Sequence, residues 1–475
     1  MELYPPSVSS TSVPIYLRLN KMVRDLTVGK SGRVIFSFCL PLFLSVVFQQ
    51  LYTIADSFVA GRFIGEEALA AVGNSYEMTL IFIAFAFGCS MGASVLVSKL
   101  FGAKEYKKLK SSVSTSIIAT AVCFSFLMVF GLIAGKRILL LINTPTSLME
   151  SSWVYLEIYL FGLPFLFLYN LSTGIFSGLG DSRTPFIFLA LSSTANIFMD
   201  IYFVAGLKMG VEGVAWATFI CQGISSILAL VVVAKRLKEV ESDEKAPLFS
   251  LPLLKGFLSV AVPTTLQQSF VSVGNILIQS TINSFGPGVM AGYAGGIKLN
   301  NLVITSFTTI GNGMSNFTAQ NLGAGKMKRI REGEKAGIKM IWTLTLPIFL
   351  LYFFFSPTLL KLFLENPSEE ALQSGKALLT ILSPFYFVVA VKLVTDGVLK
   401  GLGLMKEFMI DTFSDLILRV SLSFILSSTV LGSNGIWLSW PIGWVVGTIL
   451  SLYFYKRGTK KLFERKERRL QVEEI

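Results

Sequence analysis

The sequence has 475 residues, of which 53% are hydrophobic and only 15% are charged, and its mean hydropathy is +0.66. So little polar surface excludes an ordinary soluble fold and indicates a membrane protein. The net charge of +12 does not indicate nucleic-acid binding, because the basic residues do not form one patch among aromatic stacking residues.

Apolar runs of about 20 residues, the length that spans a bilayer, predict an all-α polytopic protein with twelve transmembrane helices. The first six are expected at 34–60, 75–98, 112–134, 151–178, 185–205 and 212–235, and the second six at 256–284, 291–320, 336–356, 372–400, 407–430 and 434–456. Residues 1–33 are predicted to form a cytoplasmic N-terminal segment, disordered to about Pro14. Residues 236–255 are predicted to form a cytoplasmic linker, and residues 457–475 a cytoplasmic basic tail that lies at the membrane surface.

The basic residues predict the orientation of these helices. Most of the 41 lysines and arginines lie at the two ends of the sequence or in every second loop, and basic loops are retained in the cytoplasm. We therefore expect a multi-pass protein of the inner cell membrane with both termini cytoplasmic. That arrangement requires an even number of spans, which twelve satisfies.

The two sets of six helices resemble each other when the sequence is shifted by about 222 residues. The matches fall at structurally demanding positions and keep their order: Pro41 with Pro263, Gly102-Ala103 with Gly323-Ala324, Gly178-Leu179-Gly180 with Gly401-Leu402-Gly403, and Gly213 with Gly435. Residues 34–235 and 256–456 are therefore predicted to be homologous halves. Because each half has an even number of spans, a pseudo-two-fold axis along the membrane normal should relate them.

A duplicated bundle has a natural cavity between its halves, and alternating exposure of that cavity indicates a transporter. A rigid membrane scaffold and a flippase for a lipid-linked precursor are the alternatives. We expect no enzymatic activity and no cofactor, because the sequence contains no histidine, nucleophile motif, metal-ligand cluster or nucleotide loop. The four cysteines lie in apolar runs without metal-ligand spacing and are interpreted as core residues.

Four segments of the first half carry a resemblance to a known family. They are Gln49-Gln50-Leu51-Tyr52-Thr53-Ile54-Ala55-Asp56-Ser57-Phe58-Val59-Ala60-Gly61, Gly178-Leu179-Gly180-Asp181, Asn196-Ile197-Phe198-Met199-Asp200 and Gly213-Val214-Ala215-Trp216-Ala217-Thr218. Together they resemble motifs of the multidrug and toxic compound extrusion (MATE) family over most of the chain. The resemblance implies a cation-driven antiporter in the lipid bilayer that exports small organic, usually cationic and amphipathic compounds, with H⁺ or Na⁺ as the coupling ion. We expect the protein to be monomeric.

Two acidic residues of the first half are predicted to lie in the membrane. A charge in the hydrocarbon costs ~2.5 kcal/mol or more and usually serves a function. Asp56 and Asp200 should lie at similar depth in the outer half of the membrane, and Asn196 shares a helix face with Asp200. These oxygen groups suit a proton or a sodium ion, whereas a solvated aspartate at a helix end is the alternative for Asp56.

The resemblance adds specific roles for residues at this depth. It implies that Asp56, Asn196, Asp200 and Thr218 form the ion-coupling site, with Tyr52 and Asn170 as further residues of the cavity. Pro41 is predicted either to bend its helix or to let that helix change shape with cation occupancy, because proline frees a backbone carbonyl.

The second half does not repeat this set of polar residues. Asn196 falls on Arg419 and Asp200 on Ser423 when the halves are aligned, so a second copy of the ion site is not expected. Lys392 with Asp396, and Asp415 with Arg419, are spaced i, i+4, which favours structural ion pairs over a second ion site. The sequence leaves the roles of Lys298, Lys392 and Arg419 open. Some other branches of the family carry a glutamate in the seventh helix, which is absent here, and Gln267 and Gln268 are the nearest polar residues.

Overall fold

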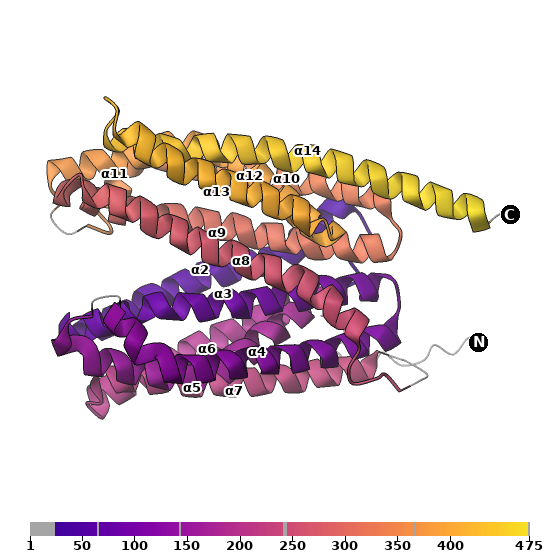
Figure 1. The fold of residues 1–475 in the computed structure, drawn as a ribbon, viewed down its shortest axis with the longest axis horizontal. Helices are drawn as coiled ribbons and strands as arrows, with labels where there is room; N and C mark the ends of the chain where they lie inside the picture. The colour runs from indigo at the N-terminus through magenta and orange to yellow at the C-terminus, as the bar shows by residue number, and fades with distance from the viewer. Residues whose placement is uncertain (1–23, 64–65, 142–143, 241–244, 365–366, 474–475) are drawn as a thin grey trace, which may run out of the picture.

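The computed structural model describes residues 24–63, 66–141, 144–240, 245–364 and 367–473. Within helices, the side chains of residues 52–74, 76, 77, 463 and 465–473 are not described. The described ranges are helical almost throughout, and they form two groups that lie side by side in Figure 1, with α2–α7 in indigo to magenta and α8–α14 in pink to yellow.

The first group contains six helices. They are α2 (Ser31–Phe63), α3 (Glu66–Gly102), α4 (Tyr106–Leu141), α5 (Thr146–Gly178), α6 (Arg183–Ile201), which continues as a π-helical turn over Tyr202–Gly206, and α7 (Gly210–Glu239). Each of the six predicted helices of the first half corresponds to one of them. The observed helices are longer at most ends because they extend beyond the apolar runs into the polar residues that flank them.

The second group contains α8 (Leu251–Asn283), α9 (Pro287–Gly323), α10 (Met327–Leu360), α11 (Glu369–Leu382), α12 (Tyr386–Leu402), α13 (Met405–Ser427) and α14 (Ser433–Glu473). A 3₁₀ turn over Ser383–Phe385 separates α11 from α12, where a single helix was predicted; Pro384 lacks the N–H that an unbroken helix needs. Counting α11 and α12 as one span, the described residues form the predicted twelve. The last helix continues through most of the predicted tail, since lysine, arginine and glutamate are good helix formers.

By length and apolar composition, nine spans in the described ranges could cross a membrane. The helices α8, α9 and α13 are not among them. These three carry polar residues well inside the helix, including Asn300 in α9 and Asp415 in α13. A membrane helix tolerates such residues when they face the interior of the bundle. The polar spans therefore indicate where a polar interior lies, namely in the second half.

The packing of the helices repeats between the halves. The first helix of the first half, α2, packs against α6 of its own half and against α9 and α10 of the other. The first helix of the second half, α8, packs in the same way against α13 of its own half and against α3 and α4. The first helix of each half thus packs in the same way against the other half, which confirms the prediction of two homologous halves related by a pseudo-two-fold axis.

Two pairs of glycines show the repeat at the level of the backbone. Gly180 and Gly403 follow equivalent helices with φ of +80° and +74°, a conformation that favours glycine. At Gly102 and Gly323, a Cβ would lie 2.0 Å from a backbone oxygen of the opposite half, so both positions require glycine where α3 and α9 cross. The sequence matches thus coincide with places where a side chain would strain or separate the halves.

The halves are joined by hydrogen bonds at the end of the bundle where residues 24–30 lie. In this segment the Leu26 N–H donates to Gln320 Oε1 at 3.0 Å, and Arg329 Nη1 donates to the Gly29 carbonyl at 2.6 Å. Gln320 Nε2 also donates to the Gly178 carbonyl of the first half at 3.0 Å. This end is the one predicted to be cytoplasmic, and its polar contacts hold the two halves together there.

Candidate functional site

Asn196 and Asp200 lie on one buried face near the end of α6. Their relative exposures are 4% and 0%. The π-helical turn begins two residues after Asp200, and such turns are frequent at functional sites because they shift the register of the helix. The helices α2 and α7 pack against α6. The two side chains are thus held inside the first half.

Thr218 lies on α7, half-buried, in a small pocket between α5 and α7 whose lining includes Tyr155 and Tyr159. One turn further along, Cys221 Sγ lies 3.4 Å from Met199 Sδ of α6. The structure therefore brings α7 next to the part of α6 that carries Asp200.

The remaining predicted residues of this region lie on α2 and α5. Tyr52 and Asp56 are in the helical backbone of α2, but their side chains lie outside the described residues, so their part in the site stays a prediction. Asn170 of α5 is half-buried, and its Nδ2 donates to the Leu166 carbonyl at 2.9 Å. The helix α2 continues through Pro41, whose carbonyl accepts a hydrogen bond from Ser45 Oγ at 2.9 Å.

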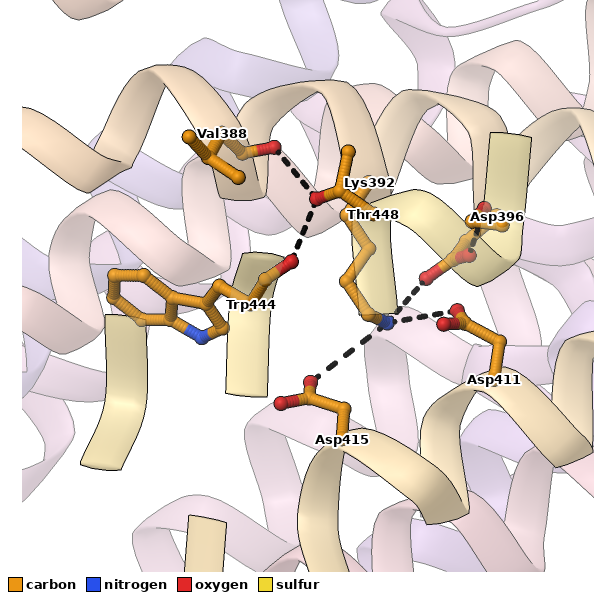
Figure 2. Close-up of polar contacts among 8 residues, drawn as sticks. Val388, Lys392, Asp396, Asp411, Asp415, Trp444 and Thr448 are labelled. Atoms are coloured by element: carbon orange, nitrogen blue, oxygen red, sulfur yellow. Dashed lines mark hydrogen bonds and ion pairs between the residues drawn. The ribbon is translucent and has the colours of Figure 1, made fainter. Parts of the chain in front are cut away.

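A second cluster of charges lies in the other half, around Lys392 of α12. The Lys392 ammonium is 2.9 Å from Asp396 Oδ2, 3.0 Å from Asp411 Oδ2 and 3.8 Å from Asp415 Oδ2. Figure 2 shows it between the three carboxylates. Ser451 Oγ of α14 donates to the other oxygen of Asp396 at 2.8 Å. We call these four charged residues the Lys392 cluster.

Helix geometry explains this arrangement. Lys392 and Asp396 are four residues apart on α12, and Asp411 and Asp415 are four apart on α13, so each helix presents two charged groups on one face. The third helix, α14, comes close because it has a glycine there: a Cβ on Gly447 would lie 2.5 Å from Lys392 Cε. The cluster is thus a product of three helices.

One of the two predicted ion pairs is present. Lys392 pairs with Asp396 as expected, whereas no ion pair within 4.0 Å joins Asp415 to Arg419 in the described structure. Arg419 instead lies over the ring of Trp440, with its Cζ 4.6 Å from the ring centroid. The sequence reasoning also missed Asp411. Its position four residues before Asp415 on the same face of the helix was the available signal.

Beside the cluster lies a cavity of about 150 Å³ between α8, α9, α12, α13 and α14. Its lining combines amides, charged groups and indole rings, and includes Gln267, Gln268, Asn275, Asn300, Asn301, Lys392, Thr412, Asp415, Arg419, Trp440 and Trp444. A cavity with aromatic walls and several polar side chains has features of a ligand site. Among the described residues, no group of three histidine, cysteine, aspartate or glutamate side chains is placed to hold a metal ion.

The loop motif that includes Asp181 has a structural role. Asp181 accepts hydrogen bonds from the Thr184 N–H at 3.0 Å and the Thr184 hydroxyl at 2.6 Å, which caps α6. It also lies 3.6 Å from the guanidinium of Arg236 in α7. Burial raises the pKa of the Asp181 carboxyl, while the Thr184 hydrogen bonds and the Arg236 charge act in the opposite direction. This contact fixes the corner between α5 and α6.

The two halves also match a known family. Residues 41–202 and 263–425 each match the MatE family model. The chain belongs to the MatE family. This multidrug efflux family consists of membrane transporters, so the repeated six-helix bundle is confirmed as a transporter architecture.

Individual MatE relatives are similar over most of their length. The chain is 28% identical to the probable multidrug resistance protein YoeA of Bacillus subtilis, over 89% of this chain and 93% of that protein. It is 21% identical to an FAD transporter of Shewanella oneidensis, over 90% of this chain and 94% of the relative. The names of these two relatives describe different cargo, so membership of the MatE family does not by itself identify a substrate.

A solved structure supports the same fold. A multidrug resistance MATE family transporter in an outward-facing conformation superimposes with a TM-score of 0.87 at 22% identity, covering 94% of this chain and 99% of the other. At this identity the likeness concerns the fold alone. These comparisons favour a transporter over an enzyme or a rigid scaffold, and they give no support to the flippase alternative.

Proposed function

We propose that the protein is a secondary active antiporter that exports organic, cationic and amphipathic compounds in exchange for protons or sodium ions. The observation that carries this proposal is the burial of Asp200 in a membrane helix, with Asn196 on the same face. Maintaining an acidic side chain there costs free energy, so such residues usually belong to an ion pathway. A proton or sodium ion would neutralise the site, and Asp56 on the adjacent helix is the proposed second carboxylate.

Coupling requires that the ion and the exported compound favour opposite conformations of the two halves. When the cation leaves, the two carboxylates repel each other in a medium of low dielectric constant. This repulsion destabilises the current conformation and favours a rearrangement of the surrounding helices. The helix α2 suits this role, because it packs on α6 of its own half and on α9 and α10 of the other. A conformational change at the ion site would therefore move α2 and alter its packing against the other half.

Alternating access also requires a closure between the halves that can open. The hydrogen bonds that join Gln320 and Arg329 to residues 24–30 and to Gly178 lie at one end of the bundle. They are polar contacts of a kind that water can replace, so their exchange costs less than exposing an apolar core. We propose that this end is cytoplasmic and closed, and that it opens to admit the compound.

The test is uptake of a fluorescent organic cation by proteoliposomes, with pH and sodium gradients imposed separately. Asp200→Asn and Asp56→Asn should each abolish gradient-driven transport in well-folded protein, whereas Asn196→Ala and Thr218→Ala should reduce it less. The double aspartate variant should be little worse than either single, because the two residues act as one unit.

Glu212→Gln is the matched control, since this acidic residue is exposed in the first turn of α7. It should leave transport unchanged. Full gradient-driven export by the Asp200→Asn variant would remove this residue from the coupling mechanism. A response to only one of the two gradients identifies the coupling ion.

A further inference from the structure

The segment that precedes α2 lies across the contact between the two halves. Residues 24–30, which we call the strap, begin beside the first half, where a Cβ at Gly180 would lie 2.0 Å from the Arg24 carbonyl oxygen. Two residues further on, Leu26 has a relative exposure of 0% and packs in an apolar core formed mainly by the second half. The strap therefore contacts both halves at the end of the bundle that is predicted to be cytoplasmic.

Hydrogen bonds fix the backbone of the strap to the second half. The Leu26 N–H donates to Gln320 Oε1 at 3.0 Å, and the Leu26 carbonyl accepts from Asn321 Nδ2 at 3.3 Å. Lys326 Nζ donates to the Thr27 carbonyl at 2.9 Å and lies 3.2 Å from the Thr27 hydroxyl oxygen. The strap precedes the first half in the sequence, yet these backbone groups bond to the end of α9 and the start of α10.

Arg329 of α10 binds the strap at two points. Its Nη1 donates to the Gly29 carbonyl at 2.6 Å and its Nη2 to the Leu26 carbonyl at 3.3 Å. Its Nε donates to Asn321 Oδ1 at 3.0 Å, which fixes the orientation of the guanidinium. Hydrogen bonds from a charged donor are stronger than those between neutral groups, and the donors of a guanidinium point in fixed directions. Loss of the Arg329 side chain should therefore weaken the attachment of the strap.

The second half shows that the bundle can form without such an insertion. The repeat places Leu26 on Leu248, in the linker that precedes α8. Leu248 has a relative exposure of 76%, although the linker bonds to the first half two residues later, where the Ser250 N–H donates to Thr115 Oγ1 at 3.1 Å. The equivalent leucine is thus buried between the halves in one copy and exposed in the other. Because both copies build the same six-helix bundle, the burial of Leu26 points to a role in the relation between the halves.

We propose that the strap holds the cytoplasmic end of the bundle closed and leaves α9 and α10 when that end opens. The strap is continuous with α2, which packs against α6, so a movement of the first half would pull the strap away from the second. Gln320 joins the strap to the closure itself, because it accepts from the Leu26 N–H and donates to the Gly178 carbonyl at 3.0 Å. This inference rests on the proposed alternating access and adds the element that controls the cytoplasmic entrance.

The experiment measures opening by the rate at which N-ethylmaleimide alkylates a buried cysteine in purified protein without the native cysteines. The reporter is Ser98→Cys, because Ser98 of α3 is 0% exposed and its hydroxyl donates to the Gly178 carbonyl at 3.2 Å, beside the closure. Arg329→Gln and Leu26→Ser should each accelerate alkylation of this reporter by roughly 10-fold to 100-fold, because each removes contacts that the closed state makes.

Two variants are matched controls. Leu248→Ser makes the same change at the exposed equivalent of Leu26, and Lys328→Gln removes the exposed charge next to Arg329. Neither should change the rate. A second reporter, Ser423→Cys, separates opening from unfolding, because Ser423 is also 0% exposed but lies near the opposite end of the bundle, late in α13. Its alkylation should stay as slow in every variant as in the parent protein.

Equal acceleration at both reporters would show that the strap only stabilises the fold, and unchanged alkylation at position 98 would show that the closure does not depend on it. Either result overturns the proposed role of the strap. Transport separates this outcome from the export proposal. Gradient-driven export of an organic cation with no selective acceleration at position 98 would refute the role of the strap alone, whereas selective acceleration without export would refute export alone.

Discussion

Replacing Lys392 by methionine should destabilise the second half strongly. The ammonium is the shared cation of two carboxylates at 2.9 and 3.0 Å, and the side chains of Lys392, Asp396 and Asp411 are each no more than 4% exposed. Removing one partner from a buried ion pair costs about 3–5 kcal/mol, because the other charge stays in a medium of low dielectric constant. Asp415 lies further away, at 3.8 Å, and is 15% exposed, so its loss adds little.

The free energy of unfolding and the midpoint temperature of detergent-solubilised protein measure this change. A loss of 3–5 kcal/mol corresponds to roughly 6–20 °C for a unit of the size of one half. Adding Asp411→Asn to Lys392→Met should recover part of the loss, because it removes one of the stranded charges. That recovery distinguishes lost ion pairing from lost packing.

Lys400→Met is the control for a buried lysine on the same helix. Lys400 has no carboxylate within 4.0 Å in the described structure and contacts the Phe408 ring, so its replacement should cost only about 0.5–2 kcal/mol. If Lys392→Met cost no more than Lys400→Met, and Asp411→Asn gave no recovery, the Lys392 cluster would not be a stabilising buried ion network.

Three further outcomes are expected. In a background without the native cysteines, a cysteine at Lys328 should react with an impermeant maleimide only from the cytoplasm and one at Glu369 only from outside, and the reverse pattern would overturn the orientation. Asp181→Ala should lower the free energy of unfolding by about 1–3 kcal/mol, since it leaves the buried Arg236 with Glu239 as its remaining carboxylate and removes the hydrogen bonds to the first turn of α6; unchanged thermal unfolding would refute that role. Gly447→Ala should cost about 1–3 kcal/mol in the same assay, because the new Cβ would lie 2.5 Å from the buried lysine side chain; a stability equal to that of the wild type would contradict this close approach.

The apolar runs and the repeat were readable without a structure because each reflects a local requirement. A span must be about 20 residues long and apolar, and a backbone position with positive φ, such as Gly180 or Gly403, favours glycine in both copies. The break between α11 and α12 and the helical continuation of α14 were missed, since a proline can be accommodated at a short 3₁₀ turn and a charged tail can still be helical.

For the candidate sites too, the sequence determined relations within one helix, whereas relations between helices required the structure. The sequence by itself determined that Asn196 and Asp200 share a helix face and that Lys392 can reach Asp396, because both relations follow from the period of a single helix. Only the tertiary structure decided that Asp411 and Asp415 from another helix approach Lys392, that Arg419 turns to Trp440, and that these groups border one cavity. Which charged groups meet across helices depends on how the helices are rotated and packed, and no local pattern in the chain specifies that rotation.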